Sequence, residues 1–214
     1  MDRQQKYVHA LSFSFLSRFY DPLIKLFMRE AEFKQKLIEF GHIEPGSRVM
    51  DLGCGTATLT LMIKQQHPDA EVYGIDGDGR ILEIARRKAV KAGIDVVLDE
   101  AMAFELPYQD NYFSRIVSSL VIHHLSMDEK RRAFQEVLRV LQSKGELHIV
   151  DFGPPKGLYA RVVSKVLARL EPVADNYRGL LMPLMKEAGF KHVKEHGTFP
   201  TLFGTLTYIS GTRG

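Results

Sequence analysis

The sequence contains a single cysteine, Cys54, among its 214 residues. One thiol excludes a disulfide within the chain, and such sparing use of cysteine is typical of proteins in a reducing compartment. No apolar run approaches the roughly 18 residues that a membrane-spanning helix needs. Residues 1–15 carry charges and lack both the long apolar core and the cleavage site of a signal peptide. These absences predict a cytoplasmic protein without a membrane span.

An excess of charge of one sign is also missing. The chain has 29 Lys and Arg against 26 Asp and Glu, which gives a net charge of +3, and the two signs are interspersed. A nucleic-acid partner is therefore not expected, because such proteins gather basic residues in a patch or stripe. The hydrophobic content of 45% is ordinary for a globular protein, and the length suits one domain with one core.

Strand-like and helix-like segments alternate along the middle of the chain. We expect strands at 48–50, 71–76, 94–98, 115–121 and 146–152, helices at 57–66, 79–92 and 128–141, and an earlier helical region at 7–41 with a helix start at Asp21-Pro22. Such alternation predicts an α/β fold with a parallel sheet covered on both faces. Right-handed crossovers place the carboxyl ends of the strands along one rim, where ligands bind in such folds.

The last third of the sequence departs from this alternation. Pro154-Pro155 opens a stretch dominated by helix, in which we expect Pro172 and Pro183 to act as interruptions. Two strand-like runs follow, at 191–199 and 202–210, and they suit an antiparallel pair at the end of the chain.

A glycine loop follows the first strand of the parallel region. Gly53 and Gly55 allow the backbone to approach a ligand closely at the start of a helix, and Asp76 lies about 20 residues further on, where an acid accepts hydrogen bonds from ribose. Asp51 would repel a pyrophosphate, Thr58 stands in place of the third glycine of the dinucleotide fingerprint, and there is no Walker lysine. A ribose-bearing ligand with a cationic amino-acid end and no phosphate, such as S-adenosylmethionine, suits this loop better.

Five segments, taken in order, resemble the class I S-adenosylmethionine-dependent methyltransferases, and most of all the subgroup of the ubiquinone/menaquinone C-methyltransferases. They are DLGCGTAT (51–58), YGID (73–76), FELPYQDNYF (104–113), HHL (123–125) and EVLRVLQSKGE (136–146). The resemblance covers roughly residues 18–151. It implies a Rossmann-like fold with a seven-stranded, mostly parallel sheet whose last strand is antiparallel, helices on both faces and a helical lid. It also implies S-adenosylmethionine as the methyl donor and S-adenosylhomocysteine as the product.

The resemblance further implies which residues hold the cofactor. The loop of Asp51, Gly53 and Gly55 holds the methionine end, Asp76 binds the ribose hydroxyls, and Ile81 packs on adenine. The remaining residues expected at the cofactor are Cys54, Gly77, Ala101, Met102, Ala103 and Ser118. No metal ligands are expected.

Several of these positions have a second interpretation. Ala57 replaces a common third glycine, and Met102 stands where an acid often contacts the adenine amino group. Asp99, Glu100 or the backbone of residues 101–103 are alternatives for that contact. Asp76 also suits a helix N-cap, Ile81 an ordinary core position and Cys54 a small filler of the loop.

Methyl transfer from a sulfonium is an in-line displacement, so the protein mainly positions the nucleophile, methyl group and sulfur. An acceptor that must lose a proton also needs a base, which contributes about 10²–10⁴-fold. His123 and His124 follow one strand of the expected rim, and Asp151 ends another. We interpret these three as candidate catalytic residues. The alternative is that the histidines shape their loop and that Asp151 caps the next segment.

The segments outside the core supply the expected acceptor pocket. The single domain of residues 1–214 would then consist of an N-terminal helical cap (1–45), a cofactor-binding core (46–152), a helical lid (153–189) and C-terminal strands (190–214). The expected lining is aromatic and comprises Phe15, Phe19, Tyr20, Tyr159 and Tyr177. Such residues also fit a plain core. A small hydrophobic or aromatic acceptor is expected, and a homodimer remains open.

Two other functions stay open at this point. One is a protein that binds S-adenosylmethionine or S-adenosylhomocysteine without turnover, as a regulator or partner subunit, which the departures at Ala57 and Met102 allow. The other is a nicotinamide-dependent oxidoreductase, against which Asp51 and Thr58 argue.

Overall fold

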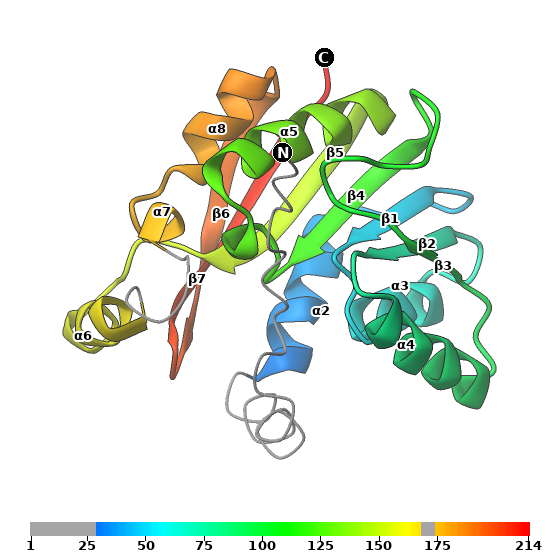
Figure 1. Ribbon diagram of the computed structural model, residues 1–214, viewed down its shortest axis with the longest axis horizontal. Coiled ribbons are helices and arrows are strands. Elements are labelled where there is room, and N and C mark those ends of the chain that lie inside the picture. Colours follow the sequence, from blue (N-terminus) through cyan, green and yellow to red (C-terminus); the bar gives the residue numbers. More distant parts are fainter. Residues whose placement is uncertain (1–28, 168–173) are drawn as a thin grey trace, which may run out of the picture.

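The computed structural model describes residues 29–167 and 174–214 (Figure 1). The strands are β1 (Arg48–Leu52), β2 (Glu71–Asp76), β3 (Val97–Glu100), β4 (Phe113–Ser119), β5 (Leu141–Phe152), β6 (Lys191–Thr201) and β7 (Gly204–Thr212). The helices are α2 (Glu30–Phe40), α3 (Thr58–Gln66), α4 (Gly79–Ala92), α5 (Met127–Val140), α6 (Leu158–Leu167), α7 (Ala174–Tyr177), α8 (Leu181–Ala188) and the short 3₁₀ helix η1 (Ile122–His124).

The strands form one seven-stranded sheet in the order β3-β2-β1-β4-β5-β7-β6. Neighbours from β3 to β5 pair in parallel, whereas β7 is antiparallel to both β5 and β6. The predicted sheet with an antiparallel last strand is thereby confirmed. The chain runs outward from β1 in one direction and from β4 in the other, so the carboxyl ends of β1 and β4 form the topological switch point where ligands bind in such sheets.

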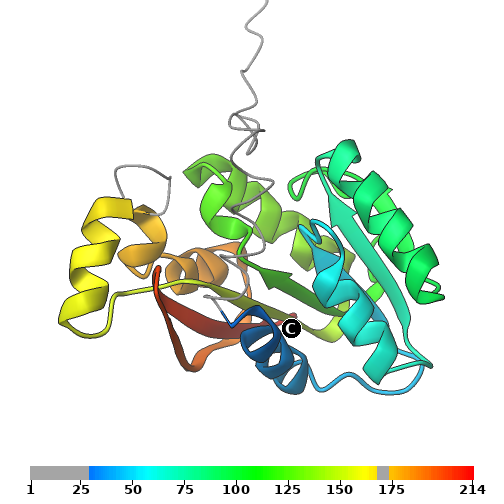
Figure 2. The same cartoon turned by 90° about the horizontal axis from the view of Figure 1, so that it is seen from below.

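Helices cover both faces of the sheet because successive strand residues point to opposite sides. Val49 and Val117 pack in a core with residues of α2 and α3. Met50 and Ile116 pack in another core with residues of α5 and α8. Figure 2 shows α6 projecting at the end of the molecule opposite to α3 and α4.

Two strands have boundaries that differ from the predicted ones. The strand expected at 94–98 begins only at Val97, because Gly93 ends α4 in the left-handed conformation and the Ile94 amide donates to the Ala89 carbonyl oxygen. The strand expected at 115–121 ends at Ser119, because Leu120 has a φ of 58° and leaves the extended conformation.

Prolines and turns account for the other differences. Strand β5 begins at Leu141, earlier than the predicted start at 146, and includes Lys144, which has a φ of 63°, at a point where the pairing with β4 shifts register. Pro183 does not interrupt a helix but lies in the first turn of α8, where its missing N–H is not needed. Of the helical region predicted at 7–41, the structure describes Glu30–Phe40 as helix; Asp21-Pro22 and Pro172 lie outside the described residues.

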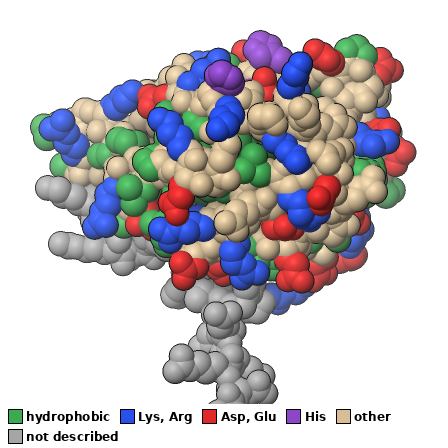
Figure 3. All heavy atoms as spheres, turned by 90° about the horizontal axis from the view of Figure 1, so that it is seen from above, with side chains coloured by type: hydrophobic (Ala, Val, Ile, Leu, Met, Phe, Trp, Pro, Cys, Tyr) green, Lys and Arg blue, Asp and Glu red, His purple; other side chains and the backbone are tan. Residues whose placement is uncertain are grey.

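The face of the molecule in Figure 3 carries basic and acidic side chains side by side rather than a patch of one sign. Among the described residues, every helix is too short or too polar to cross a lipid bilayer.

Candidate functional site

The loops that follow β1 and β4 touch each other at the switch point. An ideal Cβ built on Gly53 would lie 2.3 Å from a methyl carbon of Val121, and Gly53 has a φ of +75°. The amides of Gly53 and Cys54 both donate to the Ile75 carbonyl oxygen, at 2.7 and 2.8 Å. The loop is therefore held against β2 on one side and β4 on the other, and only glycine fits at position 53.

Replacing Gly53 with alanine should be more damaging than the same change at Gly46. Both residues have a φ near +75°, but an added Cβ at Gly46 would meet no atom within 4 Å. We expect Gly46→Ala to cost about 1–2 kcal/mol of unfolding free energy from backbone strain alone. Gly53→Ala should cost roughly a further 1–3 kcal/mol from crowding against Val121. Urea unfolding measures both, and equal losses would contradict the close packing of the two loops.

Asp51 lies near the carboxyl end of β1, and its carboxyl group is buried. Its Oδ2 accepts a hydrogen bond of 2.7 Å from the Thr60 hydroxyl in the first turn of α3. Burial raises the pKa of Asp51 to about 6, although the hydrogen bonds from Thr60 and the charge of Lys34 act in the opposite direction. A cationic ligand should bind favourably beside a buried carboxyl group with such a raised pKa, because the cation stabilises the ionised form of that group.

Asp76, at the end of β2, fastens the glycine loop. Its carboxylate accepts from the amide of Gly55 at 2.9 Å and from the amide of Asp78 at 3.0 Å. A carboxylate offers about four acceptor positions, so about two remain for other donors. Asp78, and not Asp76, caps α4, since its side chain accepts from the Arg80 amide. The N-cap interpretation of Asp76 is therefore wrong.

Open space lies next to these two carboxyl groups, at the start of α3. Gly55 has a φ of +54° and no atom within 4 Å of an ideal Cβ. The residue before α3, Ala57, gives no side-chain cap to the helix. The first amides of such a helix are a favourable place for a carboxylate. A cation, a carboxylate and two hydroxyls thus each find complementary groups around this loop, so the residues present fit an aminoacyl nucleoside.

The two acids considered as alternatives to Met102 have other neighbours. Asp99 accepts a hydrogen bond of 2.6 Å from the Tyr108 hydroxyl. The carboxylate of Glu100 lies against Gly79 in the first turn of α4, where an added Cβ would lie 2.3 Å from it. Met102 is in a bridge with Glu105 in the loop after β3.

The other residues predicted at the cofactor lie in the same group of loops and strand ends. Ala101 donates its amide to the carbonyl oxygen of Asp76, and Ala103 follows in the same loop. Gly77 directly follows β2, and Ile81, in the first turn of α4, is half-buried.

Two further members of the predicted set are buried and serve the packing of the loop. Burial raises the pKa of the Cys54 thiol, with the carboxylates of Asp51 and Asp76 acting in the same direction, which suits a loop filler and not a nucleophile. The Ser118 hydroxyl donates to the Leu52 carbonyl oxygen and joins β4 to β1.

The structure brings the three candidate catalytic residues together. His123 Nδ1 lies 2.7 Å from one carboxylate oxygen of Asp151, and the His123 amide donates to the other at 3.2 Å. His123 is 3% exposed and Asp151 is 0% exposed. Burial raises the pKa of Asp151, but the contacts with His123 and the Phe152 amide outweigh it and leave the pKa below its usual value. The ring of His124, which is exposed, lies 3.9 Å from that of His123.

Of the residues expected to line the acceptor pocket, ring contacts connect Tyr177 to His123, whereas Tyr159 is exposed. The ring of Tyr177 in α7 lies 5.9 Å from that of Phe152, which lies 5.0 Å from the ring of His123. Tyr159 is exposed on α6 and donates its hydroxyl to the Leu202 carbonyl oxygen. Phe15, Phe19 and Tyr20 lie outside the described residues.

Sequence reasoning missed three polar residues near this rim, Lys130, Asp175 and Asn176. The first of them carried a signal: position 130 falls three and four residues from Met127 and Phe134, on the apolar face of the predicted helix. A lysine on such a face is unusual, because lysine is almost never fully buried unless it is paired.

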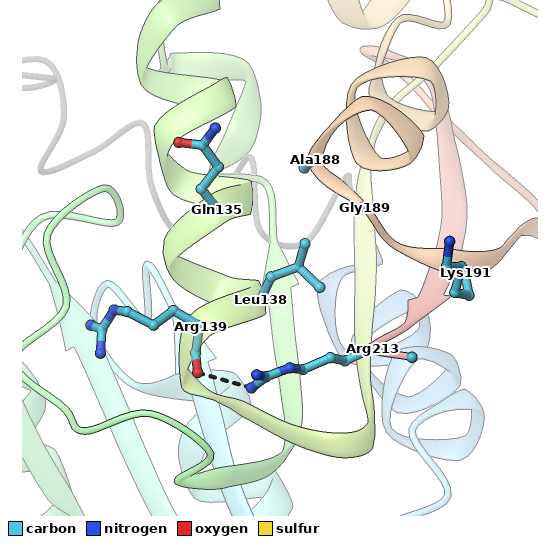
Figure 4. A pocket seen from close by; sticks show the side chains of 8 residues that line it. Gln135, Leu138, Arg139, Ala188, Gly189, Lys191 and Arg213 are labelled. Atoms are coloured by element: carbon cyan, nitrogen blue, oxygen red, sulfur yellow. Dashed lines mark hydrogen bonds between the residues drawn. The ribbon is translucent and has the colours of Figure 1, made fainter.

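A cavity of about 560 Å³ lies elsewhere, between α5 and α8 (Figure 4). It is lined by Arg139 near the end of α5 and by Lys191 at the start of β6, so it opens at the amino ends of the parallel strands. Arg139 pairs with Glu136 and Asp110, and Arg213 donates to its carbonyl oxygen at 3.0 Å. This groove is therefore distinct from the switch point.

Comparisons with known proteins agree with this geometry. Residues 49–145 match a family described as a methyltransferase domain. The chain is 34% identical over 163 residues to a demethylmenaquinone methyltransferase of Thermus thermophilus, and this alignment covers 75% of the chain and 73% of the relative.

Two further similarities are limited, the first by its coverage of the relative and the second by its sequence identity. The chain is 33% identical over 150 residues to a probable tRNA methyltransferase 9B of Mus musculus, which covers 70% of the chain but only 30% of that relative. The crystal structure of a SAM-dependent methyltransferase from Aquifex aeolicus superimposes with a TM-score of 0.69 at 17% identity, over 94% of this chain and 98% of the other. At that identity the likeness concerns the fold alone.

Proposed function

The chain belongs to the class I S-adenosylmethionine-dependent methyltransferases, and we propose that it methylates a small organic acceptor with a hydrophobic or aromatic body. The methyl donor is S-adenosylmethionine. The choice of acceptor is supported by the relative from Thermus thermophilus, whose name states a quinone-type substrate, and by the aromatic contacts of Tyr177 and Phe152 beside His123. The absence of a nucleic-acid partner stays a prediction, and the possible homodimer stays open.

One observation carries the proposed site: the carboxyl groups of Asp51 and Asp76 flank a single glycine loop at the switch point. In this proposal Asp51 faces the cationic methionine end and Asp76 accepts from the ribose hydroxyls. The start of α3, where the N-cap residue Ala57 offers no side-chain cap, receives the methionine carboxylate. When bound, S-adenosylmethionine supplies an electrophilic methyl group on its sulfonium. The protein then needs to align the acceptor with it.

We assign the removal of a proton from the acceptor to His123. Its Nδ1 proton points to Asp151, so the neutral ring carries its lone pair on Nε2. The carboxylate also stabilises the imidazolium that forms once a proton is taken. Asp151 is therefore a positioning residue in this proposal, and His124 forms the exposed edge of the same loop.

Calorimetric titration with S-adenosylmethionine and S-adenosylhomocysteine, after removal of any co-purified ligand, tests the function together with a panel of small phenols and quinols. Micromolar binding and a methylated product are expected. Binding without any product across the panel would favour the non-enzymatic alternative. A change in NADH fluorescence on mixing, without binding of either sulfur compound, would revive the oxidoreductase.

The affinity for S-adenosylmethionine should depend on pH through Asp51. Because the free carboxyl group has a pKa of about 6, it is protonated below that pH, and a cation must displace the proton in order to bind. Affinity is therefore expected to be about tenfold lower at pH 5 than at pH 7, and Asp51→Asn should abolish this dependence. Calorimetry at several pH values measures both. A flat profile for the unmodified protein would show that Asp51 does not face the cation.

A further inference from the structure

Lys130 is a buried charge in the first turn of α5. Its side chain is 0% exposed, and its Nζ has no hydrogen-bond partner among the described residues. The nearest opposite charge is Asp175 Oδ2 in α7, at 3.5 Å. An ammonium group has three protons to donate, so one ion pair without a hydrogen bond leaves its capacity unused. Buried charges are normally both paired and hydrogen-bonded.

Asn176, the next residue of α7, shows the same deficit. It is 1% exposed, and neither its amide oxygen nor its amide nitrogen has a partner within the described part of the chain. A buried amide without partners loses its hydration and gains nothing in return. Lys130 and Asn176 thus lie on two elements, α5 and α7, that the contact between Lys130 and Asp175 joins, and both side chains have unused hydrogen-bonding capacity.

This cluster lies on the acceptor side of the proposed active site. The first turn of α5 directly follows η1, which carries His123. Helix α7 packs on β5, and ring contacts lead from Tyr177 through Phe152 to His123. Asp51 and Asp76 lie at the ends of β1 and β2, away from β5 in the strand order. The cluster is therefore distinct from the residues assigned to the cofactor.

We propose that Lys130, Asp175 and Asn176 anchor an oxygen substituent, a hydroxyl or a carbonyl, on the ring of the acceptor. The inference deepens the proposed function and depends on it. The Lys130 ammonium and the Asn176 amide donate to the oxygen, and the amide oxygen of Asn176 accepts from a hydroxyl. Asp175 balances the lysine, so the site takes a neutral or weakly acidic oxygen in preference to a phosphate. The neighbouring rings of Phe152 and Tyr177 suit the apolar body of the acceptor.

The test compares two probes, 2-naphthol and naphthalene, on the protein saturated with S-adenosylhomocysteine. One or two hydrogen bonds to the oxygen should make 2-naphthol bind about tenfold more tightly or better. Lys130→Met and Asn176→Leu should each remove most of this preference while the affinity for S-adenosylhomocysteine stays unchanged. The absorbance of bound 2-naphthol should also shift toward the naphtholate at lower pH than in water, except in Lys130→Met.

Lys64→Met is the matched control, because its ammonium bonds to the carbonyl oxygens of Pro68 and Ala70 at the far end of α3. It should keep the preference. The proposal would be overturned if the two probes bound equally, if neither bound, or if the variants kept the preference. These are the results expected if only water occupied the cluster. If Lys130→Met does not fold, Asn176→Ser replaces it in the test, and loss of the preference for 2-naphthol is again the expected result. Loss of S-adenosylhomocysteine binding by the unmodified protein would instead refute the proposed function, and the naphthol preference can then still be measured without it.

Discussion

Alanine in place of Asp76 is expected to lower the affinity for S-adenosylmethionine by about 100-fold or more. Hydrogen bonds to a charged group contribute about 1.5–3 kcal/mol each, and two ribose hydroxyls would lose their acceptor. The same change releases the amide of Gly55, which the carboxylate holds at 2.9 Å, so the glycine loop loses its tie to β2 as well. Calorimetry with the folded variant measures the loss.

Asp78→Ala is the control for this experiment. Asp78 is two residues away and caps α4 through the Arg80 amide, so its loss should cost about 1 kcal/mol of stability. It should leave the affinity for the cofactor within a few-fold, because its side chain is not assigned to the ribose. If Asp76→Ala binds S-adenosylmethionine as tightly as the unmodified protein does, other residues hold the ribose and the assignment of Asp76 is wrong.

Local patterns were sufficient to predict most of the parallel core. The strand at 71–76 and the helix at 79–92 have the predicted ends, because the hydrophobic pattern and the stop signal at Gly93 are both local. The start of β3 was not predicted, since the amide of Ile94 is taken by the end of the preceding helix. Such capping competes with strand pairing and does not change the hydrophobic pattern.

The parts of the site that sequence did not predict depend on contacts between distant segments. Asp99 looked available for adenine, but its carboxylate is bonded to Tyr108 across a loop. Lys130 lies 3.5 Å from Asp175, a residue 45 positions later in the chain. Periodicity can show that position 130 faces inward, but it cannot show what it meets there. Motif order located the rim, whereas side-chain pairing across the rim needed the folded chain.

Replacing His123 with alanine is expected to reduce kcat by about 10²–10⁴-fold for an acceptor that must lose a proton. The affinity for S-adenosylhomocysteine should not change, because His123 bonds to Asp151 and is not assigned to the cofactor. An acceptor that is already anionic at the assay pH should be methylated at nearly the normal rate. His124→Ala, at the exposed neighbouring position, is the control and should have a small effect.

A role for His123 in shaping the loop would give a different pattern. All acceptors would then slow down together, whether or not they must lose a proton. If His123 is the base, the variant should slow only those acceptors that must lose a proton. The comparison of neutral and anionic acceptors therefore distinguishes proton removal from loop geometry.

Asp151→Asn tests the partner of that histidine. Removing one member of a buried pair should cost about 3–5 kcal/mol of unfolding free energy. Because the folded-state pKa of Asp151 is below its usual value, its stabilisation is complete above the unfolded pKa of about 3.9 and is lost as the pH falls through the folded value. The difference in stability between the unmodified protein and Asp151→Asn should therefore stay constant down to about pH 4 and shrink over the range in which the pH falls from about 4 through the folded pKa of Asp151. A constant difference over that range would mean that the carboxylate does not interact with His123 as an ion, and the proposed orientation of the base would lose its physical cause.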